Sequence, residues 1–146
     1  MDPRDVVAAL AAAGIERGGV IALVVVPGTG LGMAVPGASP RWSVEVADPA
    51  GLVQLVEDAL APRWAMWSSA TAIDLVRSGT RVARSWDAAA VHRLLFGGWR
   101  ADPPRVWARL HGLSTTDLPS AGPVDLFTQP DDLDDDRAVR TDGHLS

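Results

Sequence analysis

The stretches PRWAMW at residues 62–67 and SWDAAAVHRLLFGG at residues 85–98 decide how this chain is interpreted. The first has the length and apolar content of a short strand, and the second begins as a strand and continues as a helix. Between them, residues 70–77 have helical spacing, and Gly79 ends that helix. The order strand, helix, strand, helix is typical of β-α units with parallel strands.

Three further strands are predicted upstream. Residues 20–26, VIALVVV, form a β-branched run between Gly19 and Pro27, and we expect a strand buried on both faces. Residues 31–35 and 41–47 follow as the second and third of these strands. The strand that precedes the helix after Asp87 is predicted to cover residues 80–86. The first three strands are close enough in sequence to form an antiparallel meander. We therefore expect an α/β fold with a mixed sheet, in which a meander is followed by β-α units.

Aspartates mark the starts of three predicted helices: Asp48, Asp87 and Asp102 each stand where an N-cap is expected. The helix after Asp48 has an apolar stripe at positions 52, 53, 56, 59 and 60. The helix after Asp87 carries Val91, Leu94 and Leu95, and the helix after Asp102 is expected to point Val106, Trp107 and Leu110 inward.

The chain divides into three segments by composition. Residues 1–19 contain a short N-terminal helix whose alanine-rich face is expected to bury little, and we interpret this segment as an extension. Residues 20–113 form the α/β domain. Residues 114–146 contain eight acids against two arginines and no apolar periodicity, which predicts an acidic, largely disordered linker or tail.

Composition restricts the location and the partners. The 146 residues include no cysteine, which excludes disulfides and thiolate metal sites and favours a reducing, cytoplasmic compartment. No apolar run approaches the roughly 20 residues of a membrane span, so we expect no membrane association. The net charge of −5 arises from the C-terminal acids. The folded part is therefore nearly neutral and a weak electrostatic attractor for nucleic acid.

Two motifs that resemble ligand sites have simpler interpretations. The glycine-rich run at residues 28–32 lacks the Gly-Lys-Ser/Thr of a phosphate loop and the helix that should follow, so we interpret it as a hairpin turn. His92, His111 and His144 are too far apart in sequence for a metal cluster. For His92 we expect a surface or half-buried position on its helix.

The remaining candidate site is a group of arginines interleaved with tryptophans. Guanidinium groups pair with phosphates, and an exposed indole stacks on a base. The alternative is that the tryptophans, Trp99 and Trp107, are core residues and the arginines only solvate two helices. The candidate nucleic-acid-binding residues are Arg93, Arg100, Arg105, Arg109 and Trp99.

Several of these stretches resemble one family. The similar pieces are residues 62–67, residues 79–87 and the run AVHRLLFGGWRADP at residues 90–103, with DLF at 125–127 and DGHL at 142–145. Together they resemble the N-terminal exonuclease-like domain of the actinobacterial type of family A DNA polymerase, the bifunctional exonuclease and polymerase group. The resemblance extends from residue 20 to the C-terminus. It implies a small ribonuclease-H-like sheet and, as partners, a polymerase domain and DNA.

The resemblance also implies where catalytic carboxylates should stand, and this sequence departs from that pattern. Exonucleases of this fold hold two metal ions with acids on several elements. Their Asp-x-Glu motif belongs on the first strand, which here has no acid, and the third motif needs a tyrosine, which the chain lacks. Glu45, Asp74 and Asp87 remain as scattered acids. We therefore expect a non-catalytic module without a cofactor.

Two alternatives remain open. One is an active metal-dependent 3′–5′ exonuclease, for which Mg²⁺ would be required and three acids would have to converge within about 5 Å of one point. The other is a stand-alone domain that binds a protein partner through exposed tryptophans, which would show as a contiguous apolar patch of at least several hundred Å².

Overall fold

The computed structural model describes residues 3–37 and 41–115, and the predicted tail from 116 onward lies outside the described residues. The chain forms two compact units, residues 1–91 and 92–146. The strands are β1 (Val20–Val26), β2 (Gly30–Ala34), β3 (Arg41–Glu45), β4 (Arg63–Met66) and β5 (Ser85–Asp87). The helices are α1 (Pro3–Ala12), α2 (Pro49–Leu60), α3 (Ser69–Arg77), α4 (Ala88–Phe96) and α5 (Pro103–Leu110).

The first unit contains a five-stranded mixed sheet in the order β3-β2-β1-β4-β5. Strands β1, β2 and β3 form the expected antiparallel meander, with Val24 opposite Gly32 and Gly32 opposite Ser43. Strand β4 lies parallel to β1, with Ile21 opposite Trp64, and β5 lies parallel to β4. The mixed α/β architecture predicted from the sequence is therefore confirmed.

The glycine-rich run makes the first hairpin turn. The Thr29 N–H donates to the Val26 carbonyl at 3.0 Å and closes the turn between β1 and β2. A Cβ atom on Gly30 would lie 2.1 Å from the Val44 oxygen, so a larger residue does not fit there. The hairpin interpretation of this run is confirmed.

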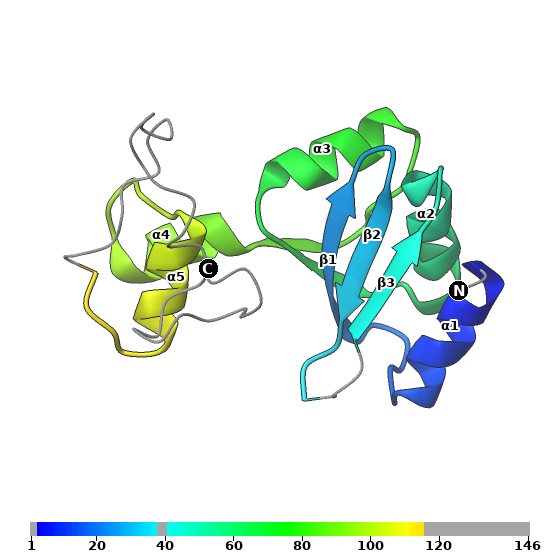
Figure 1. The fold of residues 1–146 in the computed structure, drawn as a ribbon, viewed down its shortest axis with the longest axis horizontal. Helices are drawn as coiled ribbons and strands as arrows, with labels where there is room; N and C mark the ends of the chain where they lie inside the picture. Colours follow the sequence, from blue (N-terminus) through cyan, green and yellow to red (C-terminus); the bar gives the residue numbers. More distant parts are fainter. Residues whose placement is uncertain (1–2, 38–40, 116–146) are drawn as a thin grey trace, which may run out of the picture. The chain divides into compact units, whose positions relative to one another are not determined.

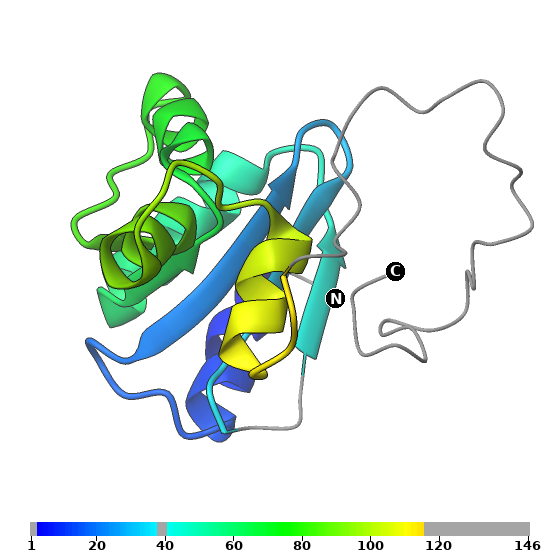
Figure 2. The same cartoon turned by 90° about the vertical axis from the view of Figure 1, so that its left-hand side faces the viewer.

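One face of the sheet is buried by helices. Alternate residues of the strands point to a common core, which also receives Val6 and Leu10 of α1, Val53 and Val56 of α2 and Leu75 of α3. Figures 1 and 2 show α1 and α2 on the same side of the strands. The burial of Val6 and Leu10 corrects the prediction for residues 1–19, because α1 is part of the core and not an appendage.

The opposite face of β1 corrects a second prediction. We expected β1 to be buried on both faces, but Val24 and Val26 are exposed while Ile21 and Leu23 are buried. The periodicity of apolar residues cannot distinguish the two cases, because every residue of this strand is apolar. Whether other elements cover the second face of the strand is decided by the tertiary structure.

The last predicted strand is shorter than expected. Strand β5 comprises residues 85–87, so only residues 85 and 86 of the predicted 80–86 segment belong to it. In the preceding residues the Thr80 hydroxyl donates to the Ala50 carbonyl at 3.1 Å, and the Arg81 N–H donates to Gln54 Oε1 at 2.7 Å. The start of this segment therefore satisfies polar groups on helix α2, and the segment rejoins the sheet at Arg84, whose carbonyl accepts from the Trp64 N–H at 3.0 Å.

A buried hydrogen bond joins α2 to β4. Trp64 is 0% exposed, and its indole Nε1–H donates to Glu57 Oε2 at 2.7 Å. Glu57 is itself buried although it lies among the apolar residues of α2. A buried indole N–H without an acceptor would be costly, so the carboxylate fixes the position of the helix on the sheet.

The second unit contains most of α4 and all of α5, and its helices differ from expectation. Leu94 is 86% exposed, and Leu95 is also exposed. Leu110 is exposed as well, although it was predicted to point inward. The buried residues of this unit are smaller: His92, Ala101, Val106 and Ala108. His92, predicted to be at the surface or half-buried, is thus a buried residue of α4.

Replacement of Glu57 tests the hydrogen bond to Trp64. Glu57→Ala should lower the free energy of unfolding by about 2 kcal/mol, because the indole N–H stays buried without an acceptor. Glu57→Gln keeps an acceptor oxygen and should lose about half as much. Urea unfolding measures both, with Glu45→Ala, at the exposed end of β3, as the matched control. Equal losses for Ala and Gln would contradict the role of the hydrogen bond.

Candidate functional site

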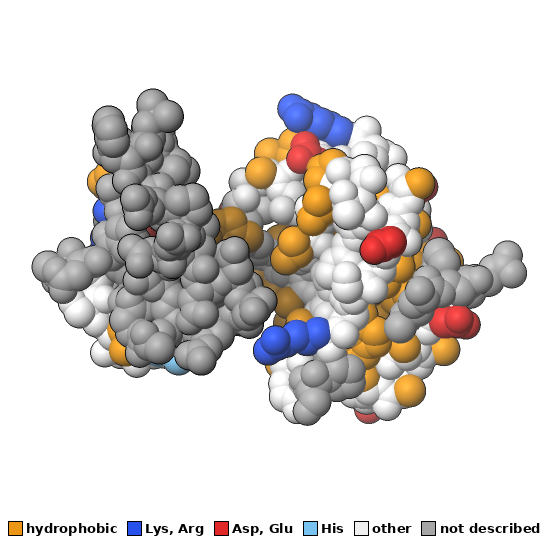
Figure 3. Space-filling view, viewed as in Figure 1, with side chains coloured by type: hydrophobic (Ala, Val, Ile, Leu, Met, Phe, Trp, Pro, Cys, Tyr) orange, Lys and Arg blue, Asp and Glu red, His pale blue; other side chains and the backbone are white. Residues whose placement is uncertain are grey.

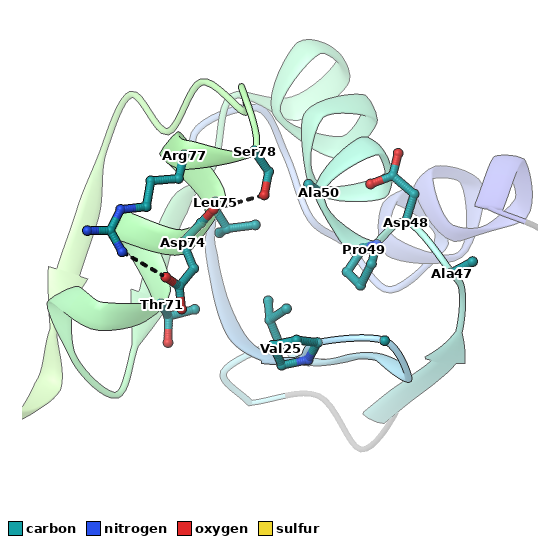
Figure 4. Close-up of a pocket in the computed structure, with 12 residues that line it drawn as sticks. Val25, Ala47, Asp48, Pro49, Ala50, Thr71, Asp74, Leu75, Arg77 and Ser78 are labelled. Carbon is teal, nitrogen blue, oxygen red and sulfur yellow. Dashed lines mark hydrogen bonds and ion pairs between the residues drawn. The ribbon is translucent and has the colours of Figure 1, made fainter.

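The first unit has a pocket at the edge of the sheet where β1 and β4 end. Parallel strands direct their carboxyl ends to one edge, where ligands of α/β proteins bind. The volume of this edge pocket is about 480 Å³. Its lining comes from the end of β1, the start of α2 and the length of α3: Val25, Pro27, Gly28, Ala47, Asp48, Pro49, Ala50, Thr71, Asp74, Leu75, Arg77 and Ser78 (Figure 4).

The two carboxylates of the edge pocket already have partners. Asp48 Oδ1 accepts from the Gly51 N–H at 3.0 Å and caps α2, as the sequence predicted. Asp74 lies one turn from Arg77, with 3.8 Å between its Oδ1 and the guanidinium Nη1. Figure 4 shows the two carboxylates on different helices, with that of Asp74 turned toward Arg77. They do not form a common oxygen cage.

The remaining scattered acids are also separate. Asp87 accepts from the Ser69 N–H through Oδ2 and from the Ala90 N–H through Oδ1, each at 2.8 Å. This carboxylate therefore holds the first turns of α3 and α4, which confirms and extends the predicted capping role. Among residues 3–37 and 41–115, no group of three or more His, Cys, Asp or Glu side chains is arranged to hold a metal ion.

The second unit brings the predicted arginines together. A pocket of about 220 Å³ lies between the end of α4, the loop after it and α5. We call it the arginine pocket, and its lining residues are His92, Phe96, Gly97, Gly98, Trp99, Arg100, Arg105 and Arg109. Four of the five residues predicted to bind nucleic acid line it, and the fifth, Arg93, lies beside it.

Local contacts hold these arginines in place. Arg93 Nε–H donates to the Trp99 carbonyl at 3.0 Å, which ties the loop back to α4. Arg100 Nε lies 3.1 Å and Arg105 Nε 3.8 Å from the same oxygen, Oδ1 of Asp102. Arg109 places its guanidinium carbon 5.9 Å from the centre of the Phe96 ring, within range of a cation–π contact.

The tryptophans of this region differ. Trp99 is 82% exposed, so the alternative that it is a core residue is wrong. Trp107 is half-buried and stacks on His111, with 3.7 Å between the ring centres. Trp99 is therefore the indole available for stacking on a base at the mouth of the arginine pocket.

His92 is the residue of this pocket that the sequence did not identify. It is 4% exposed, packs on Phe96 with 4.9 Å between the ring centres, and its Nδ1 has no hydrogen-bond partner. The sequence signal was weak, because a single histidine on an amphipathic helix is usually a surface or packing residue. Its importance depends on α5, which brings Arg105 and Arg109 to it.

Burial and the neighbouring arginines lower the pKa of His92. Removal from water disfavours the imidazolium, Arg109, Arg105 and Arg93 repel it, and Asp102 partly offsets this by favouring it. The folded protein therefore keeps the ring neutral below the ordinary histidine pKa of 6.5. Below pH 6.5 the unfolded chain therefore binds a proton at His92 more readily than the folded protein does. The free energy of unfolding decreases as the pH falls below that value.

The buried polar atoms without partners all belong to this region of the described chain: His92 Nδ1, Arg105 Nε and Asp102 Oδ2. Arg105 Nε is close enough to Asp102 for an ion pair but too far for a hydrogen bond. An unsatisfied buried polar atom costs about 1–3 kcal/mol. Two of these atoms, His92 Nδ1 and Arg105 Nε, lie on residues that line the arginine pocket, whereas Asp102 Oδ2 is an unpaired acceptor.

Comparisons with known proteins identify no family: no protein-family model, no curated protein and no solved structure matches the chain. The function must therefore be argued from the chain itself. A separate structural finding is that none of the helices among the described residues is both long enough and apolar enough to cross a membrane.

Substitution of Asp87 tests whether this acid is structural. Asp87→Ala removes acceptors from the first turns of α3 and α4 and should lower the free energy of unfolding by about 1–2 kcal/mol. Asp87→Asn keeps one acceptor oxygen and should lose less. Asp74→Ala is the control, because the ion pair of Asp74 with Arg77 is exposed and contributes only about 0.2–1 kcal/mol to the free energy of unfolding. Thermal or urea unfolding measures the difference, and equal effects at both aspartates would contradict the capping role.

Proposed function

We propose that this chain is a non-catalytic, exonuclease-like module of a family A DNA polymerase that supports the polymerase domain and contacts DNA weakly. The proposal follows the sequence resemblance at residues 62–67, 79–87 and 90–103. As part of a DNA-replicating or DNA-repairing enzyme, the chain would act in the cytoplasm. Its partners would be a polymerase domain, in the same or a companion chain, and DNA.

The observation that carries this proposal is the combination of the sheet with the positions of its acids. An antiparallel meander followed by two parallel strands, in the order β3-β2-β1-β4-β5, is compatible with the ribonuclease-H-like sheet that the resemblance implies. At the carboxyl edge of this sheet, Asp48, Asp74 and Asp87 serve a helix cap, an ion pair and a helix bridge. The scaffold is thus consistent with a nuclease ancestor whose metal ligands are missing.

The surface of the first unit suits the supporting role. Val24 and Val26 on β1 are exposed, as are Ile73 and Val76 on α3. Figure 3 shows hydrophobic side chains spread over the sheet and α3, with only scattered charges between them. A polymerase domain that covered these side chains would gain about 25 cal/mol for each Å² of apolar surface removed from water.

The arginine pocket supports the proposed contact with DNA. The described part of the second unit contains one carboxylate, Asp102, which lies near Arg100 and Arg105. It also contains Arg93 and Arg109, so positive charge is in surplus. The surplus of positive charge suits a phosphate backbone, and the exposed Trp99 suits stacking on an unpaired base. Because the first 113 residues are nearly neutral, the affinity should be modest and strongly dependent on salt.

A nuclease assay tests the non-catalytic part of the proposal. The purified chain incubated with single-stranded DNA and Mg²⁺ or Mn²⁺ should release no nucleotides, because its acids are dispersed. Denaturing gel electrophoresis of end-labelled DNA measures the release. Metal-dependent digestion that disappears in Glu45→Ala or Asp74→Ala would overturn the proposal and favour the active exonuclease.

A binding assay tests the contact with DNA. Trp99→Ala should weaken binding of a single-stranded oligonucleotide by about tenfold, since stacking contributes roughly 1–3 kcal/mol per base. Trp86→Ala is the matched control, because Trp86 is also exposed but lies on β5 of the first unit. Fluorescence anisotropy at several salt concentrations measures the affinity. Equal effects of the two substitutions would exclude the second unit as the DNA contact.

A further inference from the structure

We propose that the arginine pocket binds a phosphate group, with Arg105 and Arg109 supplying charge and the buried His92 ring donating a hydrogen bond from Nδ1. This inference deepens the proposed function and rests on it for the source of the phosphate, which is single-stranded DNA. The pocket itself is defined by geometry alone and is tested without DNA.

The first argument is that the site is built but incomplete. His92 Nδ1 and Arg105 Nε are buried, lie on residues that line the same pocket and have no hydrogen-bond partner. Buried polar groups in folded proteins are nearly always paired, so such atoms in one pocket indicate a missing acceptor. A phosphate oxygen accepts from both kinds of donor.

The second argument is the balance of charge. Three arginines, Arg93, Arg105 and Arg109, act on His92 against one carboxylate, Asp102, in the described part of the chain. Asp102 is itself shared by Arg100 and Arg105. A surplus of positive charge around a buried neutral ring favours an anion, and guanidinium groups pair with phosphate in a directional way.

The third argument is the size of the pocket. At about 220 Å³ it is smaller than the 300–1,000 Å³ typical of sites that enclose a whole drug-sized ligand. It accommodates a phosphate group while an attached nucleoside remains outside. Trp99 lines the same pocket and is exposed, so the attached base can stack on its indole.

Phosphate binding should change the protonation of His92. The ring is kept neutral by burial and by Arg93, Arg105 and Arg109, with Asp102 acting in the opposite direction. An anion in the pocket offsets the arginines, so the pKa of His92 must rise when the anion binds. By linkage, the affinity for the anion must increase as the pH falls through the range in which His92 takes up its proton.

Nuclear magnetic resonance of the full chain tests the pocket directly. The imidazole signals of His92 are followed during titration with inorganic phosphate, and with sulfate for the pH series because its charge is constant. The chain has three histidines, so substitution assigns the signals. We expect saturable shifts of the His92 signals at millimolar concentrations of anion and a higher pKa of His92 in the bound state. We also expect the affinity for sulfate to increase as the pH is lowered from about 8 to about 5.

Two variants distinguish phosphate binding in the arginine pocket from attraction of phosphate to any exposed arginine. Arg109 is exposed, so Arg109→Ala should keep the fold and weaken phosphate binding at least fivefold. Arg81→Ala removes an exposed arginine of the first unit and should leave the titration unchanged. Unchanged His92 signals at tens of millimolar phosphate, or equal titrations in Arg109→Ala and the unsubstituted chain, would overturn the proposal.

Oligonucleotides identify the source of the phosphate. Single strands with a 5′-phosphate, a 3′-phosphate or no terminal phosphate are compared at the His92 signals. Tighter binding of one phosphorylated end assigns a terminal monoester, and equal binding assigns the internal backbone. Trp99→Ala should weaken the binding of oligonucleotides and leave the binding of inorganic phosphate unchanged. Phosphate binding without any binding of single strands would retain the pocket and refute the proposed function, so the two failures are distinguishable.

Discussion

The hydrogen bond from the buried indole of Trp64 to Glu57 is the constraint on which the first unit depends. Trp64 lies on β4, which stands between β1 and β5 in the sheet, and its large side chain is removed from water. Burial of that surface stabilises the fold only if the N–H keeps an acceptor. Glu57 supplies one from α2, and α2 in turn packs on α1. One polar contact inside the apolar core therefore links α2, and through it α1, to the sheet.

Acids elsewhere in the first unit stabilise helices and are not gathered at one point of the sheet. A metal site requires several carboxylates directed to one point, held close together despite their mutual repulsion. Here Asp48, Asp74 and Asp87 are each directed to a different helix terminus or arginine. Their charges are used to stabilise helices, so the carboxyl edge contains a pocket without a cluster of oxygen ligands among the described residues.

The second unit differs from the first in the size of its core residues and in the pairing of its buried polar atoms. Its core consists of small residues such as Ala101 and Ala108, and it leaves Leu94 and Leu110 exposed. Its polar interior is incomplete, because His92 and Arg105 contain buried atoms without partners. The described part of this unit also has a surplus of positive charge, and the proposed phosphate site rests on this surplus together with the unpaired atoms of His92 and Arg105. The sheet and the arginine pocket are thus separate features of one chain.

Local sequence patterns predicted much of this structure. The caps at Asp48 and Asp87, the hairpin at residues 28–32 and the meander all follow from turn chemistry and periodicity, which depend on neighbours in the chain. The arginines were found from the sequence pattern, since Arg93, Arg100, Arg105 and Arg109 are interleaved with two tryptophans along α4, α5 and the loop between them. Errors arose where distant residues decide the outcome. Thr80 and Arg81 bond to α2 and not to the sheet, and α1 joins the core.

The sequence by itself determined the order of the elements and the kinds of side chain available, because propensity, capping and charge are local properties. Only the tertiary structure decided which side chains meet. It buried Trp64 against Glu57, assigned Asp87 to two helices and enclosed His92 beside Arg105 and Arg109. These are long-range consequences of packing, in which burial converts an ordinary histidine into an unpaired hydrogen-bonding group.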